Sequence, residues 1–218
     1  MGRAIYACDV GSVSAGNFAW ARVVPGQGHP SASVDIDDLV KNLLQDIKND
    51  MSIALGLEAP LFMPIPMDSG ALNSGRQGEG NRSMFAPPGA AVATLAIQQA
   101  AWILRAIHDG ESNLPMYTLD WRRWPSPEGV KHFLIWEAFV SGSARGTSHA
   151  QDAATAAMFF REHENDLAEV NAVKADEPLC MVHAAAIWAG WTDDNNGLRQ
   201  SCLVLKPEQP YKDRVDPA

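Results

Sequence analysis

Three acidic residues and a histidine occupy positions from which their side chains can reach one edge of a β-sheet. Asp9 follows the apolar run IYAC and Glu58 follows the run SIALGL, so each carboxylate ends a predicted strand. Asp152 falls in the first turn of a predicted helix, three residues after His149, and residues three apart share a helix face. Because open α/β sheets hold their ligands outside the strand ends, we expect these side chains to meet there.

The chemistry that such a group favours is the binding of a hard divalent cation. Carboxylates brought together from separate elements repel one another unless a cation or protons compensate. Mg²⁺ and Mn²⁺ prefer oxygen ligands, and two such ions can hold the attacking and leaving oxygens of phosphoryl transfer. Asp9, Glu58 and Asp152 are therefore candidate ligands of Mg²⁺ or Mn²⁺. Taken singly they also have structural readings, since Asp9 can shape its turn and Asp152 can favour a helix N-terminus.

Two further segments carry positive charge that suits a phosphate-containing substrate. Arg76 and Arg82 lie in a long loop, and arginine can hold phosphate bidentately, so both are candidate substrate-binding residues. The alternative for each is a solvated loop arginine. The segment WRRW at 121–124 combines stacking surfaces with charge, which suits single-stranded nucleic acid. A loop folded over the core by its tryptophans is the favoured reading of that segment.

The elements that must position these residues follow from hydrophobic periodicity. The segment 61–89 contains four prolines and five glycines and predicts a long loop. We expect it to form a mobile flap over the acidic edge. Strands are expected at about 3–10, 18–24, 32–36, 51–57, 116–119, 131–140 and 201–205, and helices at about 37–47, 90–108, 148–160 and 178–191.

This order, with strands first and then alternating helices and strands, predicts an α/β fold. We expect a mixed β-sheet with helices on both faces. The length of 218 residues fits a single domain over 1–218, with the long loop as an insertion at about 60–89. No internal repeat is present.

Composition narrows the classes of partner. A net charge of −9 disfavours tight non-specific binding of nucleic acid, which relies on Lys and Arg, but leaves nucleic acid open as a substrate. Three cysteines without metal-ligand spacing predict reduced, mostly buried thiols. The N-terminal residues lack the apolar stretch of a signal peptide, and polar residues interrupt the apolar region 90–107. We therefore expect a cytoplasmic protein without a membrane span; its oligomeric state stays open.

Short motifs resemble those of a known superfamily. The segment IYACDVGSVSAGNFAWARVV resembles the opening hairpin of the ribonuclease H-like superfamily, in which a strand-end Asp precedes a Gly/Ser turn. SIALGLEAP is similar to the later strand that carries the second acid. SHAQDAATAA resembles the helix of Holliday-junction resolvases, in which His or Asp precedes an Asp-Ala pair by three residues. The order of these motifs, over residues 3 to about 160, is most similar to a family of uncharacterised predicted nucleases with a long Arg-containing loop.

The resemblance implies a ribonuclease H-like fold and assigns roles to residues. It implies Asp9, Glu58 and Asp152 as metal ligands and His149 as a ligand or proton-transfer group. Glu137 falls near a further acidic position on a strand and would add a fourth carboxylate if it faced the site. A surface position is the favoured reading of Glu137.

Three functions are compatible with these observations. The leading one is a Mg²⁺- or Mn²⁺-dependent nuclease or phosphodiesterase that uses clustered carboxylates for two-metal hydrolysis. The second is a phosphate- or nucleotide-binding protein of the sugar kinase/actin-like branch, which usually has two such domains in a longer chain. The third is a non-catalytic binding module on the same fold. Metal dependence distinguishes the first from the third, and nucleotide binding without strand cleavage would support the second.

Overall fold

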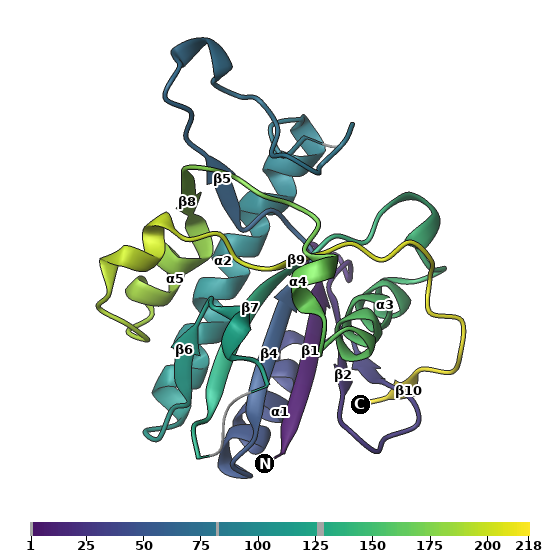
Figure 1. Ribbon diagram of the computed structural model, residues 1–218. Helices are drawn as coiled ribbons and strands as arrows, with labels where there is room; N and C mark the ends of the chain where they lie inside the picture. The colour runs from purple at the N-terminus through teal and green to yellow at the C-terminus, as the bar shows by residue number, and fades with distance from the viewer. Residues whose placement is uncertain (1, 82, 126–128) are drawn as a thin grey trace.

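The computed structural model describes residues 2–81, 83–125 and 129–218. Within these residues the chain forms an eight-stranded mixed sheet of order β10-β3-β2-β1-β4-β7-β6, with β9 also paired to β7 (Figure 1). A separate two-stranded sheet pairs β5 with β8. The strands are β1 (Arg3–Asp9), β2 (Ala19–Val23), β3 (Ser31–Ser33), β4 (Ser52–Leu57), β5 (Phe62–Pro64), β6 (Met116–Thr118), β7 (His132–Ala138), β8 (Pro178–Cys180), β9 (Val204–Leu205) and β10 (Asp216–Pro217).

Strand direction brings the ends of β1 and β4 to one edge of the sheet. Both strands are parallel to each other and to β7 and β6, whereas β2 is antiparallel to β1. Cys8 of β1 pairs with Leu57 of β4, and the next amide, that of Glu58, donates to the Cys8 carbonyl at 2.8 Å. The two strands therefore end side by side. Asp9 is the last residue of β1, and Glu58 follows the last residue of β4.

Helices cover both faces of the main sheet (Figure 1). The main helices are α1 (Ile36–Lys48), α2 (Pro87–Gly110), α3 (His149–Glu162) and α5 (Met181–Trp188), with a short α4 (Leu167–Val170). Tyr6 and Cys8 of β1 pack in the cluster that contains residues of α1, α2 and α5, whereas Ile5 and Ala7 pack in the cluster that contains residues of α3. The predicted α/β fold, with a mixed sheet covered on both faces, is confirmed.

The turn after β1 depends on a glycine. A Cβ atom added at Gly11 would lie 2.0 Å from the carbonyl oxygen of Asn17, so the two sides of the turn between β1 and β2 approach too closely there for any other residue. The side-chain amide of Gln99, on α2, donates to the Gly11 carbonyl at 2.6 Å. The turn next to Asp9 is thus fixed by close backbone contact and by a helix behind it.

Helix α3 begins where the sequence predicts a helix. The Ser148 hydroxyl oxygen accepts from the Gln151 amide at 3.2 Å and caps the helix. The Gln151 side chain accepts from the amide of Thr147, just before the helix. Ala153 and Ala154 pack against alanines of β2 and β3. Side chains this small let the helix lie close to the sheet, which brings its first turn to the acidic edge.

The starts of two helices differ from the predicted ones. α1 begins at Ile36, not at Asp37, and is capped by Asp35, whose carboxylate accepts from the amides of Asp37 and Asp38. Pro178 does not begin a helix, because residues 178–180 form β8 and α5 begins at Met181. The physical reason is a long-range one: β8 finds an antiparallel partner in β5, and this pairing prevails over the local helix signal.

The segment between β4 and α2 is not a structureless loop. It contains β5 and a 3₁₀ turn at Ser69–Ala71, and Gln77 pairs with Lys174 in an isolated bridge. Its side chains at 76 and 79 are buried. The part between these attachments projects from the body of the molecule, as the upper loop in Figure 1 shows.

Helix α2 accounts for the long apolar region. Among the described helices it is the one whose length and composition would also suit a membrane span. Five of its buried residues, Ala96, Ala100, Ile103, Leu104 and Ile107, belong to the core shared with α1, α5 and the sheet. One side of the helix therefore packs in the core, and the helix as a whole is partly buried.

Candidate metal centre

Strand alternation places two of the acids on the same face of the sheet. In β1 the odd-numbered residues Ile5 and Ala7 face α3, and Asp9 continues that series. In β4 the residue Ala54 faces α3, and Glu58 lies on the same side by period two, just beyond the strand end. The helix that covers this face supplies Asp152 from its first turn. The three acids therefore converge from β1, β4 and α3.

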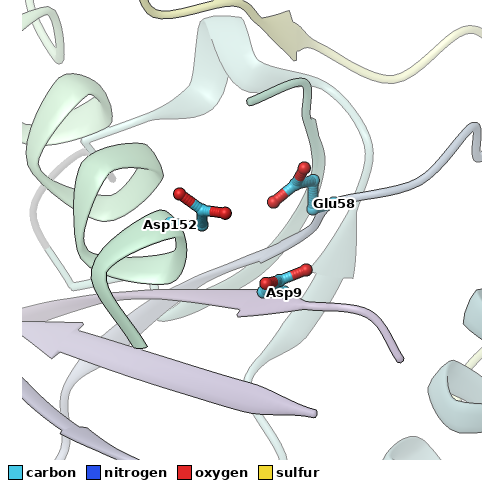
Figure 2. A group of neighbouring side chains, drawn as sticks. All are labelled: Asp9, Glu58 and Asp152. Carbon is cyan, nitrogen blue, oxygen red and sulfur yellow. The ribbon is translucent and has the colours of Figure 1, made fainter. Parts of the chain in front are cut away.

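The three carboxylates form a compact group. Each offers a ligand oxygen, and these oxygens all lie within 4.8 Å of one another. Figure 2 shows the carboxylates of Asp9, Glu58 and Asp152 pointing into a shared space between the strand ends and the helix. Asp9 and Asp152 are buried, and the Glu58 side chain is 11% exposed. The predicted convergence is confirmed, and the group has the geometry to hold a metal ion.

Neighbouring groups fix two of the acids and leave the third open. Nδ1 of His149 lies 2.6 Å from Oδ2 of Asp9, which leaves Nε2 of the imidazole outside that hydrogen bond. The amide of Gly146 donates to Oδ1 of Asp152 at 2.6 Å. By contrast, Oε2 of Glu58 is buried without a hydrogen-bond partner among the described residues. A buried unpaired carboxylate oxygen is costly, so this atom indicates a missing ligand.

Electrostatics lead to the same conclusion. Burial is the main cause that raises the pKa of Glu58, to about 9, and the nearby Asp9 and Asp152 carboxylates add to it. Burial also raises the pKa of Asp9, although the hydrogen bond from His149 works in the opposite direction. Among the described residues, Arg145 is the cation that lowers the pKa of both groups, and its Nη2 atom lies 3.9 Å from Oε1 of Glu58. A group of three carboxylates with so little compensating positive charge could hold a metal ion.

Glu137 does not join this centre, and its predicted surface position is wrong. It shares a face of β7 with Phe133 and Ile135, as period two predicts, and that face is the one opposite α3. The side chain is fully buried and forms a bidentate ion pair with Arg76, with N–O distances of 2.7 Å.

Arg76 is neither a substrate clamp nor a solvated arginine. Its guanidinium is buried and pairs with Glu137 on β7 and with Glu79, three residues further along, at 2.8 Å. Every one of these contacts is internal, so the side chain anchors the loop to the sheet. The physical reason for the correction is that its counter-charge comes from a strand 61 residues away, which local pattern does not show. Arg82 lies outside the described residues.

Two other expectations agree with the structure. Trp124 packs edge-on against Phe160 with ring centroids 5.8 Å apart, so the WRRW segment folds over the core. His183 is buried in α5, where its ring nitrogens lie 3.2 Å from the Tyr117 hydroxyl and 2.6 Å from the Asp194 carbonyl oxygen. The three cysteines are free and buried: Cys8, Cys180 and Cys202.

Arg145 is the functional candidate that sequence analysis missed. It follows a 3₁₀ turn at Gly142–Ala144 and is 59% exposed beside Glu58. Its position four residues before His149, ahead of the helix that carries Asp152, is the signal by which it could have been found.

The chain was compared with protein-family models, with curated protein sequences and with solved structures. No family model, no curated protein and no solved structure matches it.

Proposed function

We propose that this protein is a Mg²⁺- or Mn²⁺-dependent phosphodiester hydrolase of the nuclease type, on a ribonuclease H-like fold. The observation that carries the proposal is the convergence of Asp9, Glu58 and Asp152 within 4.8 Å, from two adjacent strand ends and one helix. Oε2 of Glu58, in the same group, is buried and has no hydrogen-bond partner among residues 2–81, 83–125 and 129–218. This supports the proposal, because a structural cluster of acids would be expected to satisfy that atom.

The residues divide between holding ions and handling the substrate. Asp9, Glu58 and Asp152 would hold the ions, which when bound supply an activated water and neutralise charge on the phosphoryl group. His149 is oriented by Asp9, so its Nε2 atom can accept or deliver a proton at the edge of the site. Arg145 is exposed next to Glu58 and can turn to bind a phosphate oxygen.

Charge is consistent with a substrate held through the metal centre. The protein carries a net charge of −9, so its surface as a whole repels the phosphate groups of a nucleic acid. Binding that depends on bound divalent ions would offset this repulsion locally. We therefore expect weak binding of nucleic acid in EDTA and much tighter binding with Mn²⁺.

The test is the variant Asp9→Asn, compared with wild type in thermal melts with and without Mn²⁺. Asn keeps the shape of the side chain but removes the charge that holds a hard cation. Wild type should be stabilised by about 2.7 kcal/mol when Mn²⁺ is at a hundred times its Kd. Asp9→Asn should lose that shift and should melt no lower than wild type in EDTA, since carboxylate repulsion is relieved.

Cleavage assays on single strands, duplexes and branched DNA accompany the melts. Metal-dependent cleavage by wild type should disappear in Asp9→Asn. The matched control is Asp193→Asn, an exposed acid away from the cluster that should behave as wild type. An Asp9→Asn protein that melts far below wild type in EDTA yet keeps the full Mn²⁺ shift would refute the metal role.

A further inference from the structure

A pocket of about 380 Å³ opens directly beside the acidic group. Glu58 and Arg145 form part of its lining, so the pocket and the candidate metal centre share a wall. It lies between the N-terminal end of α2, the residues that follow β7 and the segment before α2. Its volume falls within the range of about 300–1,000 Å³ that is typical of small-molecule sites.

The walls of this pocket are mainly apolar. They are formed by Pro60, Met84, Pro88, Val92, Phe139 and Val140. Beneath them lie Arg76 and Glu137, whose charges are engaged with each other in the buried ion pair. The pocket therefore suits the flat, weakly polar face of a ring more than a second phosphate.

Polar groups line the more exposed parts of the pocket. Asn81 and Arg145 are exposed, and Ser83 and Ser141 are half-buried. The Ser83 hydroxyl oxygen accepts from the Phe85 amide, so its own proton remains available to a ligand. Amide and hydroxyl groups of this kind bind the edges of nucleobases.

These observations have a single ligand chemistry in common: a flat ring with apolar faces and polar edges, joined to a phosphate. We propose that the pocket holds the unstacked nucleobase next to the phosphate bound at the metal centre, with Arg145 between the two. The substrate class is then a nucleotide or a single-stranded nucleic acid, because a base in a duplex stack cannot enter the pocket. This inference rests on the proposed function.

The test measures binding of adenosine monophosphate and thymidine monophosphate by calorimetry with Mn²⁺ present. Ribose 5-phosphate provides the phosphate and sugar without a base. Wild type should bind both nucleotides about tenfold or more tightly than ribose 5-phosphate, the gain expected for a buried, stacked base. Cleavage should likewise favour single strands over duplexes.

Two substitutions on one helix separate the pocket from the metal centre. Val92→Trp fills the pocket, whereas Ala91→Trp places the same side chain on an exposed position next to it. Val92→Trp should lose the tenfold preference while keeping wild-type affinity for ribose 5-phosphate and the wild-type Mn²⁺ shift. Ala91→Trp should behave as wild type. Should Val92→Trp fail to fold, Phe139→Ala removes one wall and should also weaken nucleotide binding.

The outcomes distinguish this inference from the proposed function. A normal Mn²⁺ shift with nucleotides binding no tighter than ribose 5-phosphate overturns the pocket and leaves the metal centre standing. Absence of any Mn²⁺ shift in wild type overturns the proposed function. In that case adenosine and thymidine are titrated into the protein in EDTA. Binding to wild type that is lost in Val92→Trp would support the nucleobase pocket. Absence of binding to wild type would overturn the pocket as well.

Discussion

Glu58 differs from its two neighbours in how its carboxylate is satisfied. Asp9 and Asp152 each receive a close hydrogen bond, from His149 and from the Gly146 amide. In the part of the chain that the structure describes, the Glu58 carboxylate has only Arg145, at 3.9 Å from Oε1, and its buried Oε2 has no hydrogen-bond partner. Without metal, the protonated form of the Glu58 carboxyl group is therefore favoured over the ionised form. Burial raises its pKa to about 9.

This predicts how stability depends on pH in EDTA. The folded chain holds the Glu58 proton more tightly than the unfolded chain, where the pKa is near 4.5. The stabilising contribution is thus fully present below about pH 4.5 and is lost as pH rises toward about 9. Glu58→Gln should remove this loss, so its Tm should exceed that of wild type increasingly from pH 5 to pH 9.

Two measurements accompany that pH series. Glu177→Gln, at an exposed acid, serves as the matched control and should follow wild type throughout. Because metal competes with the proton on Glu58, the Mn²⁺-induced Tm shift of wild type should grow with pH. Parallel Tm curves for wild type and Glu58→Gln in EDTA would argue against a buried, protonated Glu58.

At the scale of elements, the loop between β4 and α2 is held to the sheet by a buried ion pair. Arg76 bridges Glu79 within the loop and Glu137 on β7. Arg76→Met should therefore leave two buried carboxylates without a counter-charge and cost about 3–5 kcal/mol in the free energy of unfolding. Chemical denaturation measures this directly.

The control for Arg76 is an arginine whose ion pair is exposed. Arg105→Met breaks the pair with Asp109 on the surface of α2 and should leave the free energy of unfolding nearly unchanged. If both variants unfold alike, the buried pair does not anchor the loop.

Attachment of this loop at two places also changes what is expected of its motion. The amide of Ile65 donates to the Glu177 carbonyl at 2.7 Å, and the amide of Gln77 donates to the Lys174 carbonyl at 3.2 Å. Between them the tip is open, with Met67 96% exposed. Hydrogen exchange should be slow at Ile65 and Gln77 and fast at 67–73. Uniformly fast exchange over 61–88 would instead indicate the fully mobile flap that composition predicts.

At the scale of the whole molecule, the C-terminal segment supports the helix that carries Asp152 and His149. The Tyr211 amide donates to the Thr155 hydroxyl at 3.0 Å, and the Gln151 side chain donates to the Tyr211 carbonyl at 2.9 Å. The Ser143 hydroxyl donates to the Glu208 carbonyl at 3.0 Å, near Arg145. The segment then ends in β10, which pairs with β3.

Truncation after Lys206 should therefore affect stability and metal binding together. The two hydrogen bonds of Tyr211 contribute together about 2 kcal/mol to the free energy of unfolding. Their loss removes a support of the first turns of α3. We expect a lower Tm and weaker Mn²⁺ binding by calorimetry. Truncation after Lys212 removes β10 but keeps Tyr211, so it should preserve most of the metal affinity. Equal affinity in all three proteins would show that α3 is positioned without the segment.

The sequence by itself determined those features that depend on near neighbours in the chain. The short apolar runs before Asp9 and Glu58 placed both acids at strand ends, and Ser148 marked the start of α3. The pattern of apolar residues along a short segment and the residues that cap helices are sufficient for such predictions. The α/β order of elements followed from the same signals.

Only the tertiary structure decided the features that depend on distant partners. Arg76 became an anchor because Glu137, 61 residues away, is buried opposite it. Residues 178–180 became β8 because β5 offered a strand edge. The approach of α3, which brings Asp152 within reach of Asp9 and Glu58, required alanines of three separate elements to pack together. In each case the stabilising free energy comes from pairing with, or burial against, residues that are remote in sequence. The local sequence pattern does not specify which of these residues will be the partner.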